Sequence, residues 1–431
     1  MPTKKVPLGL YVMAALTALT ALMMPGTPAT AQTEKILHTF GGQNANGFQS
    51  WAGVVFDAAG NLYGTTSANH GPVDVSGGGT VFKLTPLIGG GWTEQVVHSF
   101  AENGTDGYSP LSAVLLDSAG NLYGTTQLGG PGFCYNGYYL TCGTVYELKP
   151  NPGGGWTEEI LHNFNTTGDG FGPWGGLISD ALGNLYGTTT SGGADLYYGT
   201  VFELSPQLDG SWTESLLHSF NLNGVDGWNP SAGLSFDAQG NLYGTTYAGG
   251  ANGAGTVYEL TPSGGGLWTE TVIHSFANDY HDGYNPDAGV VLDAAGNVYG
   301  ATVFGGPNNG SGNGIIFELS PQPGGSWTET IIHNFNTNQT GGGQPIGTPI
   351  LDASGNLYST ASTGGSDKSG TVFELVPSAG GGFKEKLLHT FTNADGASPY
   401  GGLIFDSSGN LYGTTRNGGA HNGGMVFEIT P

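Results

Sequence analysis

Positive charge is scarce in this sequence. Its 431 residues include 9 Lys and Arg against 33 Asp and Glu, which gives a formal net charge of −24 at pH 7. A surface that binds nucleic acid or an anionic membrane needs clustered basic side chains to neutralise phosphate groups. The composition therefore argues against nucleic acid and anionic lipid as partners.

Cysteine is also scarce, so a framework of several disulfides is excluded. The two cysteines, Cys134 and Cys142, lie eight residues apart in one predicted loop. In an exported protein such a pair forms a local disulfide, and a ring this short constrains its loop rather than the whole fold. We therefore expect a disulfide between Cys134 and Cys142.

Long apolar runs are absent after the first residues of the chain. One such run, residues 6–24, follows two lysines and precedes a small-residue site at 29–31. This order is typical of a secretory signal peptide. We expect residues 1–31 to be removed and residues 32–431 to form a secreted protein, extracellular or periplasmic, without a transmembrane segment.

Recognisable catalytic motifs are missing as well. The sequence contains no Gly-x-Ser-x-Gly elbow, no His-Glu-x-x-His and no phosphate-binding Walker loop. Three histidines, His70, His281 and His421, lie outside the repeated pattern described next. Because a loop histidine can act as a general base, His281 and the adjacent Asp282 are the catalytic candidates that remain.

What the sequence does contain is one phrase repeated seven times: Asp-x-x-Gly-Asn-Leu-Tyr-Gly-Thr-Thr, with small variations. The copies lie 54 to 63 residues apart, a period typical of propellers and solenoids. They begin at Asp57, Asp117, Asp180, Asp237, Asp293, Asp352 and Asp406.

Each repeat divides into four β-like segments bounded by Gly, Pro, Asn and Asp. In the second repeat these are residues 112–117, 121–126, 143–148 and 156–164, which we name strands A, B, C and D. The seventh repeat ends after strand C, whereas residues 33–40 match a strand D at 93–100. We therefore predict an all-β, seven-bladed propeller in one domain (32–431). Each blade has four antiparallel strands, and the N-terminal strand joins the last blade and closes the ring.

The repeated GNLYGTT, followed by GG and GTVFEL, resembles the GloVer tandem repeat of secreted bacterial proteins over the whole of residues 32–431. Its strand pattern is also similar in outline to NHL-type propellers. Members of the GloVer family are described as carrying C-terminal surface anchors. This chain ends at Pro431 without a sorting tail, so we expect release rather than anchoring. The resemblance implies no established activity.

Residues that recur in every blade are predicted to serve the scaffold. The seven strand D histidines are interpreted in this way, each bonded to a neighbouring hydroxyl or backbone group. The strand B tyrosines are expected to pack between blades. Strict alternation in strand D would place Trp92, Glu94, Val96, His98 and Phe100 on one face.

Variation is concentrated in the D–A and B–C loops, which we expect on one face of the ring. The D–A loops combine carboxylates with aromatics and lead into the inner strands, so we predict that they surround the channel mouth. Aromatic rings beside polar groups suit a glycan or cell-surface polymer. The predicted ligand-binding residues are Asp106, Asp169, Asp226, Asp282, Tyr108, Phe171, Trp174, Trp228 and Tyr284, with Trp51 and Tyr400 close by in sequence.

Other interpretations stay open. No dedicated metal site is expected, although Asp106, Asp169, Asp226, Asp282 and Asp395 could supply oxygens for Ca²⁺ near the axis. A secreted polysaccharide lyase or glycoside hydrolase using Asp and His on the same face is one alternative. A protein-interaction scaffold without a small ligand is another. The leading expectation is a monomeric binding protein rather than an enzyme, without a cofactor.

Overall fold

The computed structural model describes residues 32–431, apart from 42–45, 69–76, 136–138, 166–167, 280, 308–311, 337 and 339. The predicted signal peptide and His70 lie outside these residues. All of the elements assigned within the described part of the chain are β-strands. No helix in that part is long and apolar enough to span a membrane.

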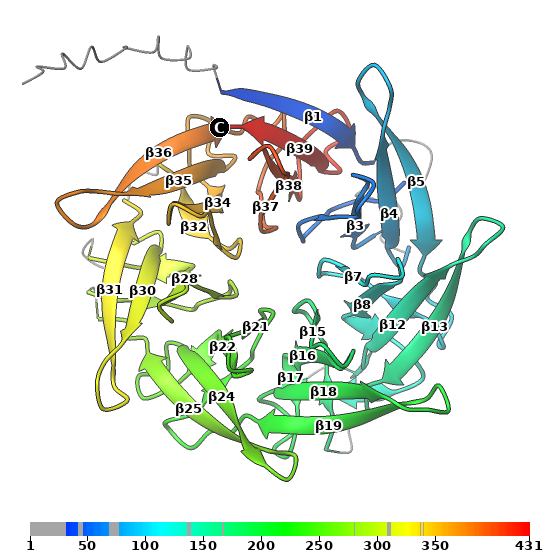
Figure 1. The fold of residues 1–431 in the computed structure, drawn as a ribbon, viewed down its shortest axis with the longest axis horizontal. Coiled ribbons are helices and arrows are strands. Elements are labelled where there is room, and N and C mark those ends of the chain that lie inside the picture. Colours follow the sequence, from blue (N-terminus) through cyan, green and yellow to red (C-terminus); the bar gives the residue numbers. More distant parts are fainter. Residues whose placement is uncertain are drawn as a thin grey trace, which may run out of the picture. The chain divides into compact units, whose positions relative to one another are not determined.

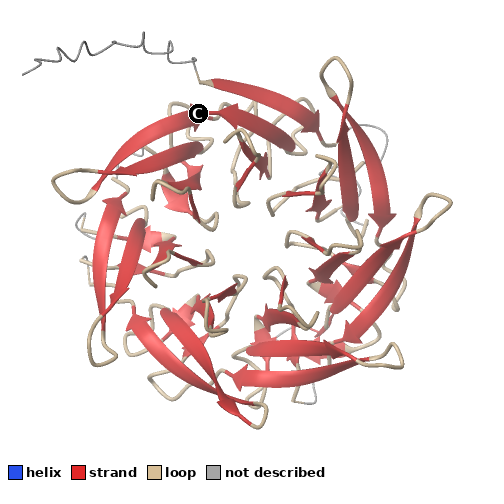
Figure 2. Ribbon diagram, in the orientation of Figure 1, coloured by secondary structure: helices blue, strands red, loops and turns tan. Residues whose placement is uncertain are grey.

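Seven antiparallel sheets form the blades of a closed ring (Figures 1 and 2), which confirms the predicted propeller. In chain order, strands A to D of the first three blades are β2 (Val55–Phe56), β3 (Leu62–Thr66), β4 (Thr80–Pro86) and β5 (Trp92–Ser99); β7 (Leu115–Leu116), β8 (Leu122–Thr126), β12 (Thr144–Pro150) and β13 (Trp156–Asn163); β15 (Ile178–Ser179), β16 (Leu185–Thr189), β18 (Thr200–Pro206) and β19 (Trp212–Ser219).

The remaining blades follow the same order. Their strands are β21 (Ser235–Phe236), β22 (Leu242–Thr246), β24 (Thr256–Gly264) and β25 (Leu267–Ser275); β27 (Val291–Leu292), β28 (Val298–Thr302), β30 (Ile315–Pro321) and β31 (Trp327–Asn334); β33 (Ile350–Leu351), β34 (Leu357–Thr363), β35 (Thr371–Pro377) and β36 (Phe383–Thr390), with β32 (Gly343–Pro345) also on β34; and β37 (Ile404–Phe405), β38 (Leu411–Thr415), β39 (Met425–Thr430) and β1 (Thr33–Thr39).

Strand β1 closes the ring as predicted. It pairs antiparallel with β39, from Thr33 opposite Thr430 to Thr39 opposite Met425. After β1, Phe40 is fully buried and packs on Phe82 of the first blade, with ring centroids 5.0 Å apart. The N-terminal segment therefore completes the last sheet and also fills the junction with the first.

The turn between strands A and B explains the start of the repeated phrase. In the first blade, one carboxylate oxygen of Asp57 accepts the backbone N–H groups of Ala59 and Asn61 at 2.9 Å. Its other oxygen accepts the Asn61 amide and the Tyr63 hydroxyl. Gly60 has a φ of 81°, a region that costs other residues energy. The phrase thus encodes a hydrogen-bonded turn.

The Thr-Thr end of the phrase links adjacent blades. The hydroxyl of Thr65 donates to the carbonyl of Ser112 at the start of the next inner strand, and Thr414 does the same to Ala52 across the closing junction. Thr66 shares a 2.7 Å hydrogen bond with Thr80 within its own blade. These buried hydroxyls satisfy backbone and side-chain groups that no water reaches.

Strand D departs from the predicted alternation because it contains a β-bulge. In the first blade the register changes so that Val81 lies opposite His98 while Phe82 lies opposite Val96, which leaves Val97 extra. Before the bulge, Glu94 faces the preceding blade, 3.9 Å from His38. After it, His98 faces the following blade, 3.5 Å from Glu158. The prediction that Glu94 and His98 share a face is therefore wrong.

Four loop pairs add short two-stranded ladders outside the blades, and the second blade carries a hairpin arm. The ladders are β6 (Gly107–Tyr108) with β9 (Leu128–Gly129), β14 (Gly170–Phe171) with β17 (Ser191–Gly192), β20 (Gly227–Trp228) with β23 (Ala248–Gly249), and β26 (Gly283–Tyr284) with β29 (Phe304–Gly305). The arm pairs β10 (Phe133–Tyr135) with β11 (Tyr139–Thr141).

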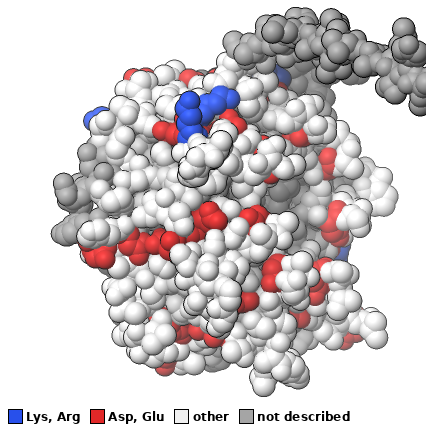
Figure 3. All heavy atoms as spheres, turned by 60° about the vertical axis from the view of Figure 1, so that its left-hand side comes forward, with Lys and Arg blue, Asp and Glu red and all other residues white. Residues whose placement is uncertain are grey.

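The hairpin arm carries the predicted disulfide. Cys134 and Cys142 are joined, and both are buried in the core between the second and third blades. Elsewhere the surface is dominated by uncharged groups, with acidic side chains in several groups on the face shown in Figure 3 and few basic ones.

Candidate functional site

A cavity of about 330 Å³ opens where the inner strands of all seven blades converge. A volume of this size can hold a single sugar residue. In each blade, one residue that lines this cavity starts the segment that leads into strand A, which we call the inner segment. Residues lining the cavity include Trp51, Leu111, Trp174, Ser231, Asp287, Ile346 and Tyr400, one from each blade.

These seven residues occupy the same position of the repeat but differ in chemistry. The next two residues of each segment are small because neighbouring inner strands approach closely. A Cβ on Gly53, for example, would lie 2.5 Å from the carbonyl oxygen of Gly402. We call the seven residues the inner ring. The flanking positions repeat from blade to blade, whereas the inner ring varies.

A second set of variable residues follows the Thr-Thr pair of strand B, and we call it the outer ring. Each member donates a backbone N–H, or in one blade a hydroxyl, to the carbonyl of the residue two positions before the inner-ring residue of its blade. The outer ring is Ser67, Gln127, Thr190, Tyr247, Val303, Ser362 and Arg416.

The residue that receives this bond adopts a left-handed conformation in every blade, with φ between 53° and 65°. Only the third blade has glycine there, Gly172. In every blade, the backbone N–H of this left-handed residue also donates to a carbonyl in the loop of the preceding blade. Asn285, for example, donates to the Ala254 carbonyl at 2.8 Å. Two backbone hydrogen bonds thus hold a conformation that is unfavourable for non-glycine residues. They fix the position of both rings.

A second cavity of about 350 Å³ shares Trp174, Ser231 and Asp287 with the first. Its lining residues come from the second, third, fourth and fifth blades. Its other lining residues are polar or aromatic: Gln127, Thr190, Ser191, Asn229 and Tyr247. The two cavities together form the candidate functional site, which we call the channel mouth.

Aromatic rings gather on one side of the channel mouth. The centroid of Trp51 lies 5.0 Å from that of Tyr400 and 6.3 Å from that of Trp174, both edge-on. Trp51 is held in place by a 3.1 Å hydrogen bond from its indole N–H to the Ser67 hydroxyl. The guanidinium carbon of Arg416 lies 3.8 Å from the centroid of Trp51.

The opposite side of the channel mouth is polar. The Ser231 hydroxyl donates a hydrogen bond to the Asp287 carboxylate. Burial raises the pKa of Asp287, an effect that this hydrogen bond partly offsets. Aromatic faces and a hydroxyl–carboxyl pair therefore meet in one cavity, an arrangement that can stack an apolar face and hydrogen-bond to hydroxyl groups.

The structure places the predicted ring of aspartates away from this cavity. Each is held at the end of an outer strand, where it accepts a loop N–H and contacts the strand D histidine. Asp282, for example, accepts the Ala277 N–H at 2.9 Å and lies 3.3 Å from His274. Because each belongs to a different blade junction, Asp106, Asp169, Asp226, Asp282 and Asp395 do not converge on the axis as a Ca²⁺ site there would need.

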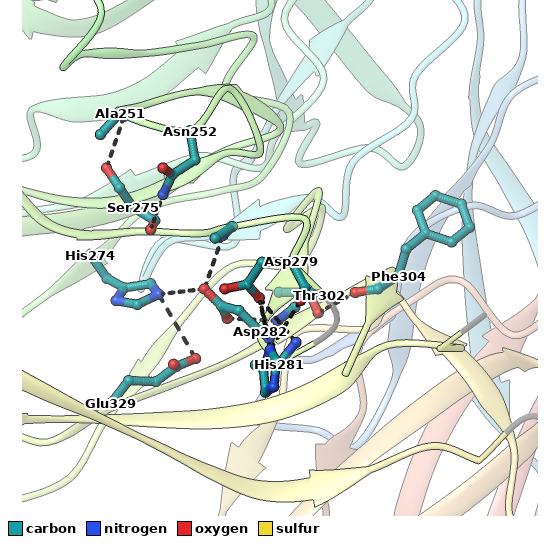
Figure 4. Close-up of polar contacts among 12 residues, drawn as sticks. Ala251, Asn252, His274, Ser275, Asp279, His281, Asp282, Thr302, Phe304 and Glu329 are labelled. Carbon is teal, nitrogen blue, oxygen red and sulfur yellow. Dashed lines mark hydrogen bonds and ion pairs between the residues drawn. The ribbon is translucent and has the colours of Figure 1, made fainter. Parts of the chain in front are cut away.

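Each of these aspartates instead forms a cluster with a histidine and a glutamate of the neighbouring blade. Figure 4 shows His274 between Asp282 and Glu329, whose oxygens lie 3.3 and 3.8 Å from its Nε2 atom. The clusters are His98–Asp106–Glu158, His162–Asp169–Glu214, His218–Asp226–Glu270, His274–Asp282–Glu329 and, across the closing strand, His389–Asp395–Glu34. The histidines thus bond mainly to carboxylates, not to the hydroxyl or backbone groups predicted.

Burial governs the charges at these junctions. It raises the pKa of Glu270 to about 7, with a further contribution from Asp226. Burial and the neighbouring Asp106 likewise raise the pKa of Glu158. Each raised glutamate can therefore keep a proton near neutral pH and donate it within the cluster, which removes the repulsion between two carboxylates.

Two junctions lack the aspartate. Asn46 takes its place beside His38, with a 3.1 Å contact to the Nε2 atom, and Gly341 takes it near His333. Without a carboxylate partner in the loop, burial lowers the pKa of both histidines to about 4. At His274, burial is outweighed by Asp282 and Glu329, and the pKa is raised.

A histidine nitrogen and two carboxylates are donors that could also hold a divalent cation, with ligand atoms within 4.8 Å of one another. A proton held between the two carboxylates explains the close approach of these three side chains equally well. The sequence signal for these clusters was present, since the His, Asp and Glu recur together. A strict period of two along strand D does not reveal the bulge that brings Glu and His from different blades face to face.

The predicted D–A aromatics support the loops. Tyr108 accepts a 3.1 Å hydrogen bond from Thr141, and Phe171 is buried between blades. Trp228 packs edge-on against Tyr198, and Tyr284 stacks on Phe304 with centroids 5.5 Å apart. Of the predicted ligand-binding residues, Trp174 lies in the wall of the channel mouth.

The two catalytic candidates have different surroundings. The His281 side chain is 86% exposed, and its Nδ1 atom lies 3.0 Å from the carbonyl of Asp279 in the same turn (Figure 4). Asp282 belongs to the junction cluster with His274. Although His281 and Asp282 are adjacent in sequence, their side chains therefore lie in separate environments.

These features define a class: a seven-bladed propeller whose repeated residues build the blades and whose variable rings surround the channel mouth. Within that class, the chain belongs to the Gloeobacter/Verrucomicrobia repeat family, whose model matches residues 131–328 and 269–431. This confirms the resemblance to the GloVer repeat. No curated protein matches the sequence.

Two solved structures are similar in fold. One is the extracellular domain of a hybrid two-component system from B. thetaiotaomicron, with 12% identity, a TM-score of 0.56, and coverage of 93% of this chain and 42% of that one. The other is PorZ, a surface component of the type-IX secretion system of Porphyromonas gingivalis, with 13% identity, a TM-score of 0.49, and coverage of 91% and 47%. The chain spans less than half the length of either, and the likeness concerns the fold alone.

Proposed function

We propose that this protein is an exported propeller that binds a sugar residue of a glycan or cell-surface polymer at the channel mouth. The observation that carries the proposal is the composition of the inner ring. Three of its seven positions are aromatic, with Trp51 edge-on to both Trp174 and Tyr400, and all three share one cavity with Ser231 and Asp287. A pyranose offers an apolar C–H face to such rings and hydroxyls to such polar groups.

Export is part of the proposal. The predicted signal peptide, the disulfide in the hairpin arm and the family membership support it. Disulfides persist in oxidising compartments outside the cytosol. The similar domain of the hybrid two-component system is extracellular, which agrees with this location.

The test is binding of the purified protein to a panel of insoluble polysaccharides, with both protein depletion and released sugars measured. We expect depletion without release. Trp174→Ala should abolish it, because it removes an aromatic wall shared by both cavities. Trp228→Ala is the matched control, since that ring packs on Tyr198 outside the cavities, and it should bind as the wild type does.

Other results would change the proposal. Equal loss of binding in Trp174→Ala and Trp228→Ala, with both variants folded, would move the ligand site to the D–A aromatics. Released sugars would indicate a hydrolase or lyase, to be tested with Asp287→Asn and His281→Ala. No binding across the panel would contradict the carbohydrate proposal and favour a protein-interaction scaffold.

A further inference from the structure

One residue of the outer ring differs from all the others in charge. Arg416 is the single arginine of the whole sequence, in a chain with a net charge of −24. It follows the Thr-Thr pair of the seventh blade, and its backbone N–H donates to the Ser398 carbonyl at 3.0 Å. Its contacts with Trp51 and Tyr400, two wall residues of the first cavity, place the only guanidinium of the protein beside the channel mouth.

Arg416 is held by aromatic rings of the inner ring. Its guanidinium carbon lies 3.8 Å from the centroid of Trp51 and 5.5 Å from that of Tyr400. A guanidinium stacked on aromatic faces keeps its N–H edge free for in-plane hydrogen bonds. Because Trp51 and Tyr400 line the cavity, only these side chains separate the Arg416 guanidinium from the cavity interior.

The guanidinium has no acidic partner among the residues that the structure describes. Lys35, Lys149 and Lys386 each lie within 3.2 Å of a glutamate on the outer strands, but no carboxylate lies within 4.0 Å of Arg416 in the described chain. Its Nε atom is buried and has no hydrogen-bond partner among the described residues. A buried donor without a partner is costly, and a planar carboxylate matches the fork of an arginine well.

The surrounding charge limits what kind of anion can bind. Acidic side chains far outnumber basic ones in the chain, and several groups of them lie on the face shown in Figure 3, so a long polyanion would be repelled. A neutral glycan with a single acidic residue meets much less repulsion. Its carboxylate can pair with Arg416 while its neutral hydroxyls meet Ser231 and Asp287 on the other side of the cavity.

We propose that the channel mouth recognises an isolated uronate on an otherwise neutral glycan, with the uronate carboxylate bound by Arg416. This inference rests on the proposed carbohydrate function and names its ligand class. Trp51 and Tyr400 position the guanidinium, and Trp174 supplies the wall against which the sugar packs.

The test uses two xylo-oligosaccharides of equal length in titration calorimetry. One carries a single glucuronate, and the other is the same compound with the carboxyl reduced to an alcohol. We expect the wild type to prefer the acidic compound by about tenfold or more, as for a hydrogen bond to a charged group. Arg416→Gln should bind both compounds equally, and Arg416→Lys should keep part of the preference.

Lys83→Gln is the matched control, because Lys83 also lies over an aromatic ring, 5.4 Å from the centroid of Tyr63, away from the channel mouth. It should leave the preference unchanged. Circular dichroism and thermal unfolding establish that each variant is folded.

A wild type that binds both compounds equally, or an Arg416→Gln variant that keeps the preference, would overturn the uronate inference and leave carbohydrate binding intact. Failure to bind either compound would also overturn it. The polysaccharide panel then decides separately whether the proposed function survives.

Discussion

A histidine and a glutamate from different blades face each other at every blade junction, and their charges depend on what lies beside them. At three of the five junctions where the loop supplies an aspartate, its carboxylate lies within hydrogen-bond distance of the histidine Nε2 atom, as that of Asp169 does for His162 at 3.1 Å. Where Gly341 replaces the aspartate, His333 lies 3.6 Å from Glu385 in a largely uncharged pair. Burial lowers the pKa of His333 to about 4 and raises that of Glu385 to about 7.

These shifts determine how the junction contributes to stability with pH. The pKa of Glu385 is higher in the folded state than its ordinary value of 4.5, so its contribution is complete below pH 4.5 and is lost as the pH rises through 7. The pKa of His333 is lower than its ordinary 6.5, so its contribution is complete above pH 6.5 and is lost as the pH falls through 4.

Glu385→Gln should therefore remove the loss of stability that the wild type shows as the pH rises toward 7. The variant cannot ionise at this position, so its thermal midpoint relative to wild type should rise between pH 4.5 and about pH 8 and then level off. Unfolding followed by circular dichroism across this range measures the difference. A difference that stays constant with pH would contradict the raised pKa of Glu385.

At the scale of elements, the closing strand β1 contributes both backbone pairing and core packing. The register with β39 satisfies an edge that would otherwise be exposed. The pair Lys35 and Glu428, 3.1 Å apart, adds little because the lysine side chain is half-exposed. Most of the stabilisation by this segment therefore comes from Leu37 and Phe40, which are buried between the last and first blades.

Phe40→Ala should lower the free energy of unfolding by about 3–5 kcal/mol, because it leaves a cavity in a fully buried position of the closing junction. Denaturant unfolding measures this loss. Ile36→Ala on the same strand is the control. Its side chain is 43% exposed, and the change should cost less than about 1 kcal/mol. Similar costs for both changes would show that β1 acts through its backbone alone.

At the scale of the whole molecule, the ring has no natural beginning. Thr33 and Thr430 are partners in the closing sheet, at the place where the other blades have a short turn between strands C and D. Seven equivalent junctions bury seven separate hydrophobic clusters, so stability depends on ring closure rather than on where the chain starts.

A circular permutant tests this directly. Residues 32–40 are moved to follow Pro431 through a copy of the turn at residues 87–91, so that the last blade becomes continuous. Because all pairings of β1 are retained, we expect the same circular dichroism spectrum and a thermal midpoint within a few degrees of the parent. Failure of the permutant to fold, beside a parent that folds, would show that the free N-terminal strand is needed for folding.

The repeated phrase and the segments around it determined the number of blades and the strand order, and the match of residues 33–40 to strand D determined the closing strand. Those features follow from local chemistry: an Asp-Gly-Asn turn and a count of segments depend only on neighbours along the chain. The pairing of Cys134 with Cys142 was also predictable, since a chain with two cysteines close in sequence leaves little choice.

Only the tertiary structure decided which variable residues meet. The bulge at Val97 turns Glu94 and His98 to opposite blades, an effect that strict alternation misses. Trp51, Trp174, Asp287 and Arg416 come from four blades and are far apart in sequence. Ring closure brings the inner-ring positions, among them Trp51, Trp174 and Asp287, around one cavity and places Arg416 of the outer ring against Trp51.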